Sequence, residues 1–230
     1  MDPDAAWHML ESWLGQRFEI DGIFYGVYPV GAFTTDFPLV MERGIIKMTY
    51  AEDFLAALNG NPLVDDRVSE LVLSTARPCF WHHDDILAGA TEKQLKRAEL
   101  DARYGMDVGV SVPLLTPSGR VCGGFGLRHR GQDAAVFDRM MDAGISDLVR
   151  LLHAFESLFR GPYARQCFGL STQEVRVLTY IAGGMAIAQT GWEIQLSPKT
   201  VEAYLASVRR KTRSRSTAEA VAKAIFFQII

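Results

Sequence analysis

Residues 196–212, LSPKTVEAYLASVRRKT, constrain the fold of this chain more than any other segment. Ser197 is a typical N-cap residue, and Pro198 follows at the first helical position, where a missing N–H costs nothing. Apolar residues then recur at i, i+3, i+4 and i+7, which is the spacing of one helix face. The sequence predicts an amphipathic helix whose inward face consists of Val201, Tyr204, Leu205 and Val208.

The opposite face of this helix combines positive charge with small side chains. Alanines between two cations allow the helix to approach a flat partner closely, and further cations from Arg209 to Arg215 extend the charge past its end. Such a surface suits the phosphates and base edges of DNA. The predicted outward stripe is Lys199, Ala203, Ala206 and Arg210, with Glu202 and Ser207 beside it.

Shorter helices are predicted on either side. Ser171 and Glu174 have the spacing of a capping box, a second helix is expected over residues 187–194, and Ser216 with Glu219 begins a last one. Two short helices joined by a tight turn, the second with an outward basic stripe, form a helix-turn-helix whose second helix enters the DNA major groove. The alternative is an ordinary four-helix domain with a charged surface.

Charge is divided unevenly along the chain. The 230 residues carry a net charge of −3. Residues 161–230 hold nine Lys or Arg and four Asp or Glu, whereas residues 1–160 hold 15 basic and 23 acidic side chains. This asymmetry suggests two domains with different partners, and a basic small domain suggests nucleic acid.

Composition predicts a cytoplasmic protein. No apolar run reaches the length of a membrane span, so no membrane partner is expected. The acidic N-terminus lacks the basic and apolar regions of a secretory signal. Three distant cysteines, Cys79, Cys122 and Cys167, fit reduced thiols better than a disulfide framework.

Residues 1–160 alternate between helical and strand patterns. Two β-rich runs flank the turn signal at residues 116–119, which predicts a hairpin. The other expected elements are a helix that ends at Gly22, a strand over residues 23–30, and helices over residues 49–58, 65–78 and 137–159. The alternation predicts a sheet flanked by helices, followed by a linker at residues 161–169.

Seven C-terminal positions follow the spacing of a known family: Leu170, Gly184, Ser197, Thr200, Val201, Leu205 and Lys211. With them, residues 170–230 resemble the DNA-binding domain of LuxR-type transcriptional regulators. One departure is Gln189-Thr190-Gly191, where the family usually has Glu-Ile-Ala. The resemblance and the outward stripe together predict DNA contacts from Lys199, Thr200, Glu202, Ala203, Ser207, Arg210 and Lys211.

Residues 1–160 look like the autoinducer-binding domain of the quorum-sensing branch of that family. Its fold is an α-β-α sandwich that encloses an acyl-homoserine lactone, so the resemblance implies an α+β chain with this sandwich before the all-α domain of four helices. Tyr50, Trp81 and Gly109 match family pocket positions. Asp66 matches the aspartate that accepts the ligand amide N–H, although a role as N-cap or as salt-bridge partner is the alternative.

Two pocket positions depart from the family pattern. Phe54 stands where the family has a tryptophan, and Leu58 stands where it has a second tyrosine. The family tryptophan donates its indole N–H to the lactone carbonyl, and Phe54 has no donor. Loss of a hydrogen bond to a buried ligand carbonyl typically weakens the binding free energy by ~1–3 kcal/mol. The predicted ligand is a different acyl-lactone, a non-lactone molecule or none, bound by Tyr50, Phe54, Leu58, Asp66, Trp81 and Gly109.

The resemblance implies a homodimer on a two-fold double-stranded DNA site, with RNA polymerase as a further partner. The helix at residues 137–159 and the apolar end of the last helix are candidate dimer surfaces, the latter with Phe226, Phe227, Ile229 and Ile230. The alternative function is a ligand-independent (orphan) regulator, or an anti-regulator that forms heterodimers with a related activator.

The sequence gives only weak signals for a metal site, a phosphate-binding loop or a catalytic site. The run WHHDD at residues 81–85 invites a metal interpretation, but adjacent histidines point apart in regular structure, so a structural or surface role is expected. Gly123, Gly124 and Gly126 lack the context of a phosphate loop and are expected to leave room for a ligand or neighbour. No Ser-His-Asp or Cys-His set stands out, so we expect no enzyme, no metal and no cofactor beyond the small ligand.

Overall fold

The computed structural model describes residues 2–28 and 44–230. The chain forms two compact units, one of residues Asp4–Phe155 and one of Glu156–Ile230 with the first three residues. No helix in the described ranges is long and apolar enough to cross a membrane. The division falls near residue 160, the predicted end of the first domain, but inside a continuous helix.

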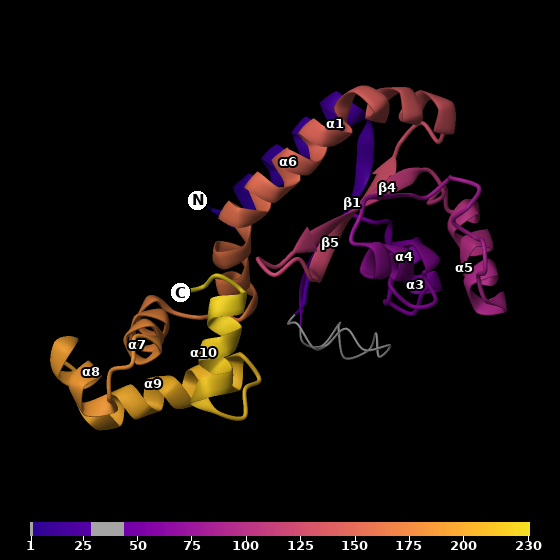
Figure 1. The fold of residues 1–230 in the computed structure, drawn as a ribbon. Coiled ribbons are helices and arrows are strands. Elements are labelled where there is room, and N and C mark those ends of the chain that lie inside the picture. Colours follow the sequence, from indigo (N-terminus) through magenta and orange to yellow (C-terminus); the bar gives the residue numbers. More distant parts are fainter. Residues whose placement is uncertain (1, 29–43) are drawn as a thin grey trace. The chain divides into compact units, whose positions relative to one another are not determined.

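A five-stranded antiparallel sheet is the centre of the first unit (Figure 1). Its strands, in the spatial order β2-β1-β5-β4-β3, are β1 Ile20–Val27, β2 Ile45–Met48, β3 Cys79–Phe80, β4 Gly109–Leu115 and β5 Val121–His129. The predicted hairpin is confirmed between β4 and β5, where the Thr116 N–H donates to the Arg120 carbonyl at 2.8 Å.

Helices cover both faces of this sheet, as the α-β-α prediction required (Figure 1). Trp7 of α1 packs on Tyr25 of β1 and on Phe155 of α6. The neighbouring Phe24 points to the opposite face, where it stacks with Tyr50. One face carries α1 (Pro3–Phe18) and α6 (Ala134–Cys167), and the other carries α3 (Glu52–Ala57), α4 (Arg67–Thr75) and α5 (Glu92–Arg103).

Some predicted boundaries in the first unit were wrong. The first helix ends at Phe18 rather than Gly22, because Glu19 has a left-handed φ of 52° and the chain then enters β1. The predicted strand over residues 23–30 begins earlier, at Ile20, and its last two residues lie outside the described ranges. Helix α5 was not predicted from the sequence, and none of its residues is buried.

The predicted linker at residues 161–169 is mostly helix. Helix α6 continues to Cys167 and includes Pro162, whose side chain is exposed. Proline removes the N–H that would bond to the Leu158 carbonyl, and Leu158 is 65% exposed on the same solvent face. Gly161 lies against the chain end, because a Cβ there would stand 2.2 Å from the Gln228 carbonyl oxygen. The packing of Gly161 against Gln228 therefore outweighs the tendency of Gly161 and Pro162 to end a helix.

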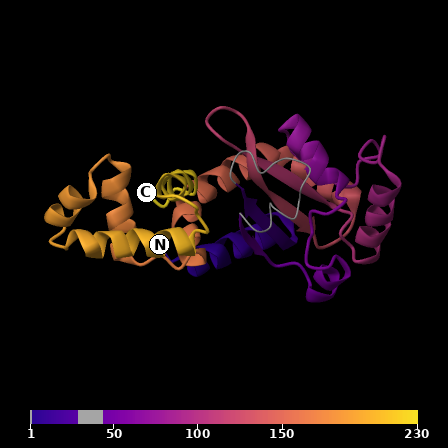
Figure 2. The same cartoon turned by 90° about the horizontal axis from the view of Figure 1, so that it is seen from below.

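The second unit contains the predicted four helices, drawn orange to yellow in Figure 2. Apolar faces from all of them meet in one core, in which Val177, Leu178 and Val201 have no exposed surface. The capping box at Ser171 and Glu174 is formed by both of its hydrogen bonds. The helices are α7 (Thr172–Ala182), α8 (Ile187–Glu193), α9 (Pro198–Lys211) and α10 (Thr217–Phe226).

The apolar end of α10, a predicted dimer surface, is partly covered within the second unit. Phe227 is fully buried and packs edge-on against Phe168 at 5.4 Å between ring centroids. Arg160 of α6 donates to the Phe226 carbonyl at 3.1 Å and lies over its ring. Phe227 therefore serves the core of the second unit, whereas Phe226 is half-buried and Ile225 is 57% exposed.

Candidate ligand cavity and DNA-recognition helix

A cavity of about 740 Å³ lies between the sheet and the helices α4 and α5. Its walls are largely apolar, with Phe24, Val72 and Ile86 among them. Polar side chains, among them those of α4, α5 and β4, also reach it, and four of the six predicted ligand-binding positions lie in its lining. The predicted positions in its lining are Tyr50, Phe54, Asp66 and Trp81.

Glycine in β5 makes room for Tyr50. The Tyr50 hydroxyl donates to the Gly126 carbonyl at 3.3 Å, and a Cβ on Gly126 would stand 2.8 Å from that hydroxyl oxygen. The same Cβ would lie 3.6 Å from the Trp81 ring. Gly126 therefore lets both side chains meet over the sheet, as expected for small residues in this strand. Burial raises the pKa of Tyr50, which stays a neutral hydrogen-bonding group.

Trp81 is fixed by two contacts with β4. Its indole N–H donates to the Ser111 hydroxyl oxygen at 2.9 Å, and its backbone N–H donates to the Gly109 carbonyl at 3.0 Å. A Cβ on Gly109 would stand 2.6 Å from the Trp81 ring. Gly109 is not in the cavity lining, and its contact with the Trp81 ring shows that it positions that side chain.

Asp66 occupies the alternative role that the sequence left open, at the N-cap of α4. Its carboxylate accepts hydrogen bonds from the N–H groups of Val68 and Ser69, at 3.1 and 3.2 Å. It also lines the cavity and is half-buried. Capping does not exclude ligand contact, because a carboxylate offers about four lone-pair positions.

The two departures from the family pattern have different surroundings. Phe54 is 1% exposed and lies at the cavity, where the Arg97 guanidinium sits over its ring at 5.8 Å. Leu58 forms the C-cap of α3 and is not among the lining residues. The missing tyrosine at residue 58 therefore removes no polar group from this cavity.

Sequence reasoning missed three polar groups of the cavity. Ser111 lies in β4, the strand beside the glycine-rich β5. Arg97 and Asp101 lie one turn apart on α5 and form an ion pair at 2.8 Å. The capping box of Thr91 and Gln94 was a readable signal for that helix.

Asp101 is a carboxylate with a strongly perturbed pKa. Burial raises the pKa of Asp101 to about 6, while Arg97 opposes the rise and Asp66 adds to it. The Arg97 guanidinium is also bound to the Val64 carbonyl at 2.9 Å. The cavity thus contains a fixed cation and an acid that titrates near neutral pH.

On α9, the inward and outward faces are arranged as predicted. Val201 and Val208 have no exposed surface, and Ser197 caps the helix by accepting the Thr200 N–H at 3.1 Å. Half-buried Thr200 and Ser207 bond within the helix, to Ser197 and Arg210 respectively. The fully exposed members of the predicted contact set are Lys199, Glu202, Ala203 and Arg210.

Lys211 is held inside the domain and does not extend the outward stripe. Its ammonium donates to the Glu174 carboxylate at 2.7 Å and to the Gly169 carbonyl at 2.8 Å. Glu174 is 3% exposed. Burial opposes its ionisation, but the hydrogen bonds from Lys211 and Ser171 lower the pKa of Glu174 to about 2. Lys211 therefore stabilises the helix-turn-helix.

In α8 the residues that depart from the family pattern, Thr190 and Gly191, are both buried. Gly191 is buried where the turn closes, and a Cβ there would stand 2.6 Å from the Leu196 carbonyl oxygen. Thr190 is fully buried, and its hydroxyl has no hydrogen-bond partner among the described residues. A buried unpaired hydroxyl is destabilising.

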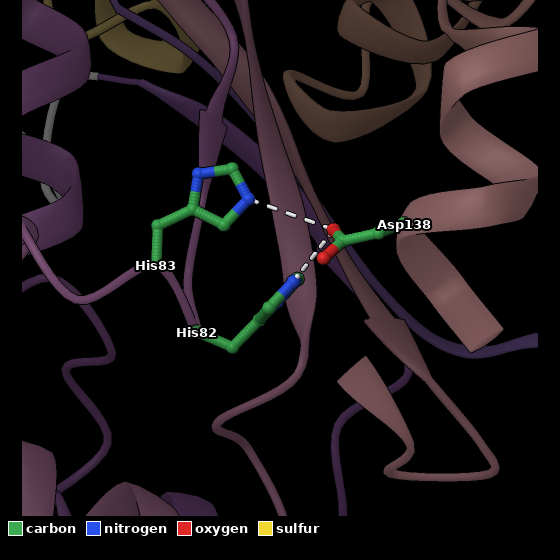
Figure 3. Close-up of side chains that lie close together, drawn as sticks. All are labelled: His82, His83 and Asp138. Atoms are coloured by element: carbon green, nitrogen blue, oxygen red, sulfur yellow. Dashed lines mark hydrogen bonds and ion pairs between the residues drawn. The ribbon is translucent and has the colours of Figure 1, made fainter. Parts of the chain in front are cut away.

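The histidine pair in WHHDD does not point apart. His82 and His83 lie in a turn after β3, outside any regular strand, so side-chain alternation does not apply. Both Nε2 atoms face Oδ1 of Asp138 on α6, at 2.9 and 3.5 Å (Figure 3). The expectation that these histidines diverge was wrong, because it assumed an extended backbone.

We predict that Asp101→Asn makes the protein more stable at neutral pH. The folded pKa of about 6 lies above the ordinary value, so the protonated acid stabilises the fold below pH ~4 and this contribution is lost as pH rises to about 6. Asparagine removes that loss, so urea unfolding at pH 7.5 should show a free energy of unfolding that is higher by about 3 kcal/mol.

The gain should disappear below pH ~4, where both residues are neutral. Glu92→Gln on the same helix, at a side chain that is 83% exposed, is the control and should change little. A less stable Asp101→Asn protein at pH 7.5 would show that the Arg97 ion pair outweighs burial.

Comparison with known proteins assigns the second unit to a family. Residues 169–224 match the family described as bacterial regulatory proteins, luxR family. The chain is similar to Escherichia coli SdiA in the P6522 crystal form, with a TM-score of 0.55, 16% identity, and 100% of this chain and 92% of that chain covered. A search of curated proteins finds no match.

Two further solved structures are more distantly similar. SdiA in complex with octanoyl-rac-glycerol has a TM-score of 0.45 and 17% identity over 98% of this chain and 88% of that chain. The phage VqmA–DPO complex has a TM-score of 0.26 and 21% identity over 53% and 48%. The C-terminal domain of this chain therefore belongs to the luxR family of bacterial regulatory proteins, and the chain shares the fold of SdiA.

Proposed function

We propose that this protein is a transcriptional regulator of quorum-sensing type that binds a two-fold DNA site as a dimer under the control of a small acyl ligand. The observation that carries the proposal is the outward face of α9, whose two cations lie exposed on a helix-turn-helix of the luxR family. It is not proposed to be an enzyme, and its partners are DNA and the ligand.

The surface of α9 supports contact with a DNA groove. Ala203 and Ala206 are exposed between Lys199 and Arg210, so no bulky side chain keeps the helix backbone away from base edges. The cations provide phosphate or guanine contacts. The basic charge of residues 161–230, against the acidic remainder, favours a polyanion as partner of this domain alone.

The cavity supports a ligand with an apolar chain and a small polar head. Its volume of about 740 Å³ lies within the usual range for small-molecule sites. Its walls are largely apolar, and two polar-tipped side chains, Tyr50 and Trp81, meet at Gly126. The Ser111 hydroxyl accepts from Trp81, so its own hydrogen is available to a ligand acceptor.

Arg97 compensates for the missing tryptophan donor. Its guanidinium lies over Phe54, the residue that stands at the family tryptophan position. Guanidinium has five N–H donors, and the described contacts with Asp101 and Val64 use only part of them. We propose that a ligand carbonyl near Phe54 accepts from Arg97, with an acyl-homoserine lactone or a related acyl molecule as the ligand.

A ligand-independent regulator or heterodimer-forming anti-regulator is the second candidate. It is favoured by the buried unpaired Thr190 hydroxyl in α8 and by Phe54 in place of a donor. Gel shift with the purified protein alone identifies an anti-regulator, which requires its partner and does not bind an operator by itself. A ligand-independent regulator binds the operator alone, with an affinity that acyl ligands do not change.

We predict that Lys199→Ala and Arg210→Ala each weaken binding to an operator selected from random duplexes. Loss of a phosphate contact reduces the slope of log K against log salt by about 1, and loss of a base contact costs ~1–3 kcal/mol. Fluorescence anisotropy over a range of salt concentrations measures both. Lys96→Ala, which removes an exposed cation of α5, should leave affinity and slope unchanged. Unchanged binding in both α9 variants would exclude this docking face.

We predict that the full-length protein binds N-octanoyl-homoserine lactone or octanoylglycerol in the cavity with one equivalent per chain. Val72 is buried in the lining, so Val72→Phe should weaken binding about tenfold by occupying ligand volume. Calorimetry measures the affinity. Met9→Phe, at a 70% exposed position of α1, is the control. Equal affinity in Val72→Phe, or no binding of either probe, would contradict the assignment.

A further inference from the structure

Three potential metal ligands lie close together at one edge of the first unit. His82 and His83 follow β3, and Asp138 lies on the first turns of α6 (Figure 3). The two Nε2 atoms and a carboxylate oxygen all lie within 4.8 Å of one another. Ligands around a tetrahedral Zn²⁺ are separated by roughly 3.3 Å, so small side-chain rotations suffice to enclose an ion.

The donor set selects a class of metal. Two imidazole nitrogens with one carboxylate suit divalent transition metals, whereas Mg²⁺ and Ca²⁺ prefer sites made of oxygen ligands. Three protein ligands leave a further position for water. The cluster has the chemistry of an open Zn²⁺ site and lacks the four thiolate or imidazole ligands of a closed structural site.

Burial divides the three ligands into one fixed and two accessible groups. The His82 side chain is 8% exposed and packs edge-on against Phe137. His83 and Asp138 are 46% and 43% exposed, so an ion can enter from solvent. His83 is held in place by stacking on Phe80, at 4.9 Å between ring centroids. The two imidazoles are therefore oriented before an ion arrives.

We propose that His82, His83 and Asp138 form a binding site for a divalent transition metal ion of the zinc class. His82 and His83 also belong to the cavity lining. A bound ion therefore fastens this wall of the cavity to α6 more firmly than the present hydrogen bonds to Asp138 do.

The surroundings indicate how tightly the ion is held. A metal-bound histidine usually donates its other ring N–H to a carboxylate, carbonyl or water, but Nδ1 of His82 is buried without a hydrogen-bond partner among the described residues. The absence of such a partner weakens metal affinity by about 10- to 100-fold. We therefore expect reversible binding that chelators remove easily, without unfolding the protein.

The test uses the full-length protein without a polyhistidine tag, titrated with Zn²⁺ in a calorimeter and with Co²⁺ by visible absorption. We expect one saturable equivalent per chain and a d–d band of low-coordinate Co²⁺ that Zn²⁺ displaces. His83→Ala and Asp138→Asn should each weaken binding by at least about tenfold. Both side chains are partly exposed, so both variants should fold with an unchanged circular dichroism spectrum.

Two controls separate this site from other metal-binding groups. His8→Gln removes an imidazole that is 77% exposed on α1, and Cys167→Ser removes the exposed thiol. Both variants should keep the affinity of the parent protein. The proposal fails if no saturable binding of either ion is found, or if His83→Ala and Asp138→Asn bind as tightly as the parent protein does.

Discussion

The helix-turn-helix depends on the buried carboxylate of Glu174. It accepts the Ser171 N–H at the start of α7 and the Lys211 ammonium at the end of α9, each at 2.7 Å. A charge with 3% exposure is tolerated only when it is paired and hydrogen-bonded, so this contact fixes the two helices relative to each other. The same contact engages the Lys211 ammonium within the domain and leaves Lys199 and Arg210 as the exposed cations of the predicted set.

In the first unit, two glycines let large side chains pack closely against the sheet, and these contacts shape the cavity. Gly126 admits the Tyr50 hydroxyl, and Gly109 admits the Trp81 ring, which Ser111 then holds by a hydrogen bond. These contacts place polar groups over one face of the sheet and keep the opposite face for the packing of α1 and α6. The cavity therefore results from missing side chains in β4 and β5 as much as from the helices around it.

Elements whose ends depend on local residue preferences could be predicted from the sequence. Ser197 with Pro198 predicted the start of α9, and the turn signal at residues 116–119 predicted the hairpin. Features that depend on contacts between residues far apart in the chain could not be predicted. Pro162 and Gly161 read as a linker, but contact with the chain end at Gln228 keeps α6 helical. Arg97 lies on a helix that buries no residue, and nothing local revealed that it reaches Phe54.

The central claim is that the cavity and the recognition helix belong to one ligand-controlled regulator. The direct measurement is the affinity of the full-length protein for its selected operator, at fixed salt, with and without a saturating acyl ligand. A coupled regulator should show a change of about fivefold or more in operator affinity, in either direction, and by linkage the operator should change ligand affinity by the same factor. Equal operator affinities with the cavity filled and empty would contradict the claim.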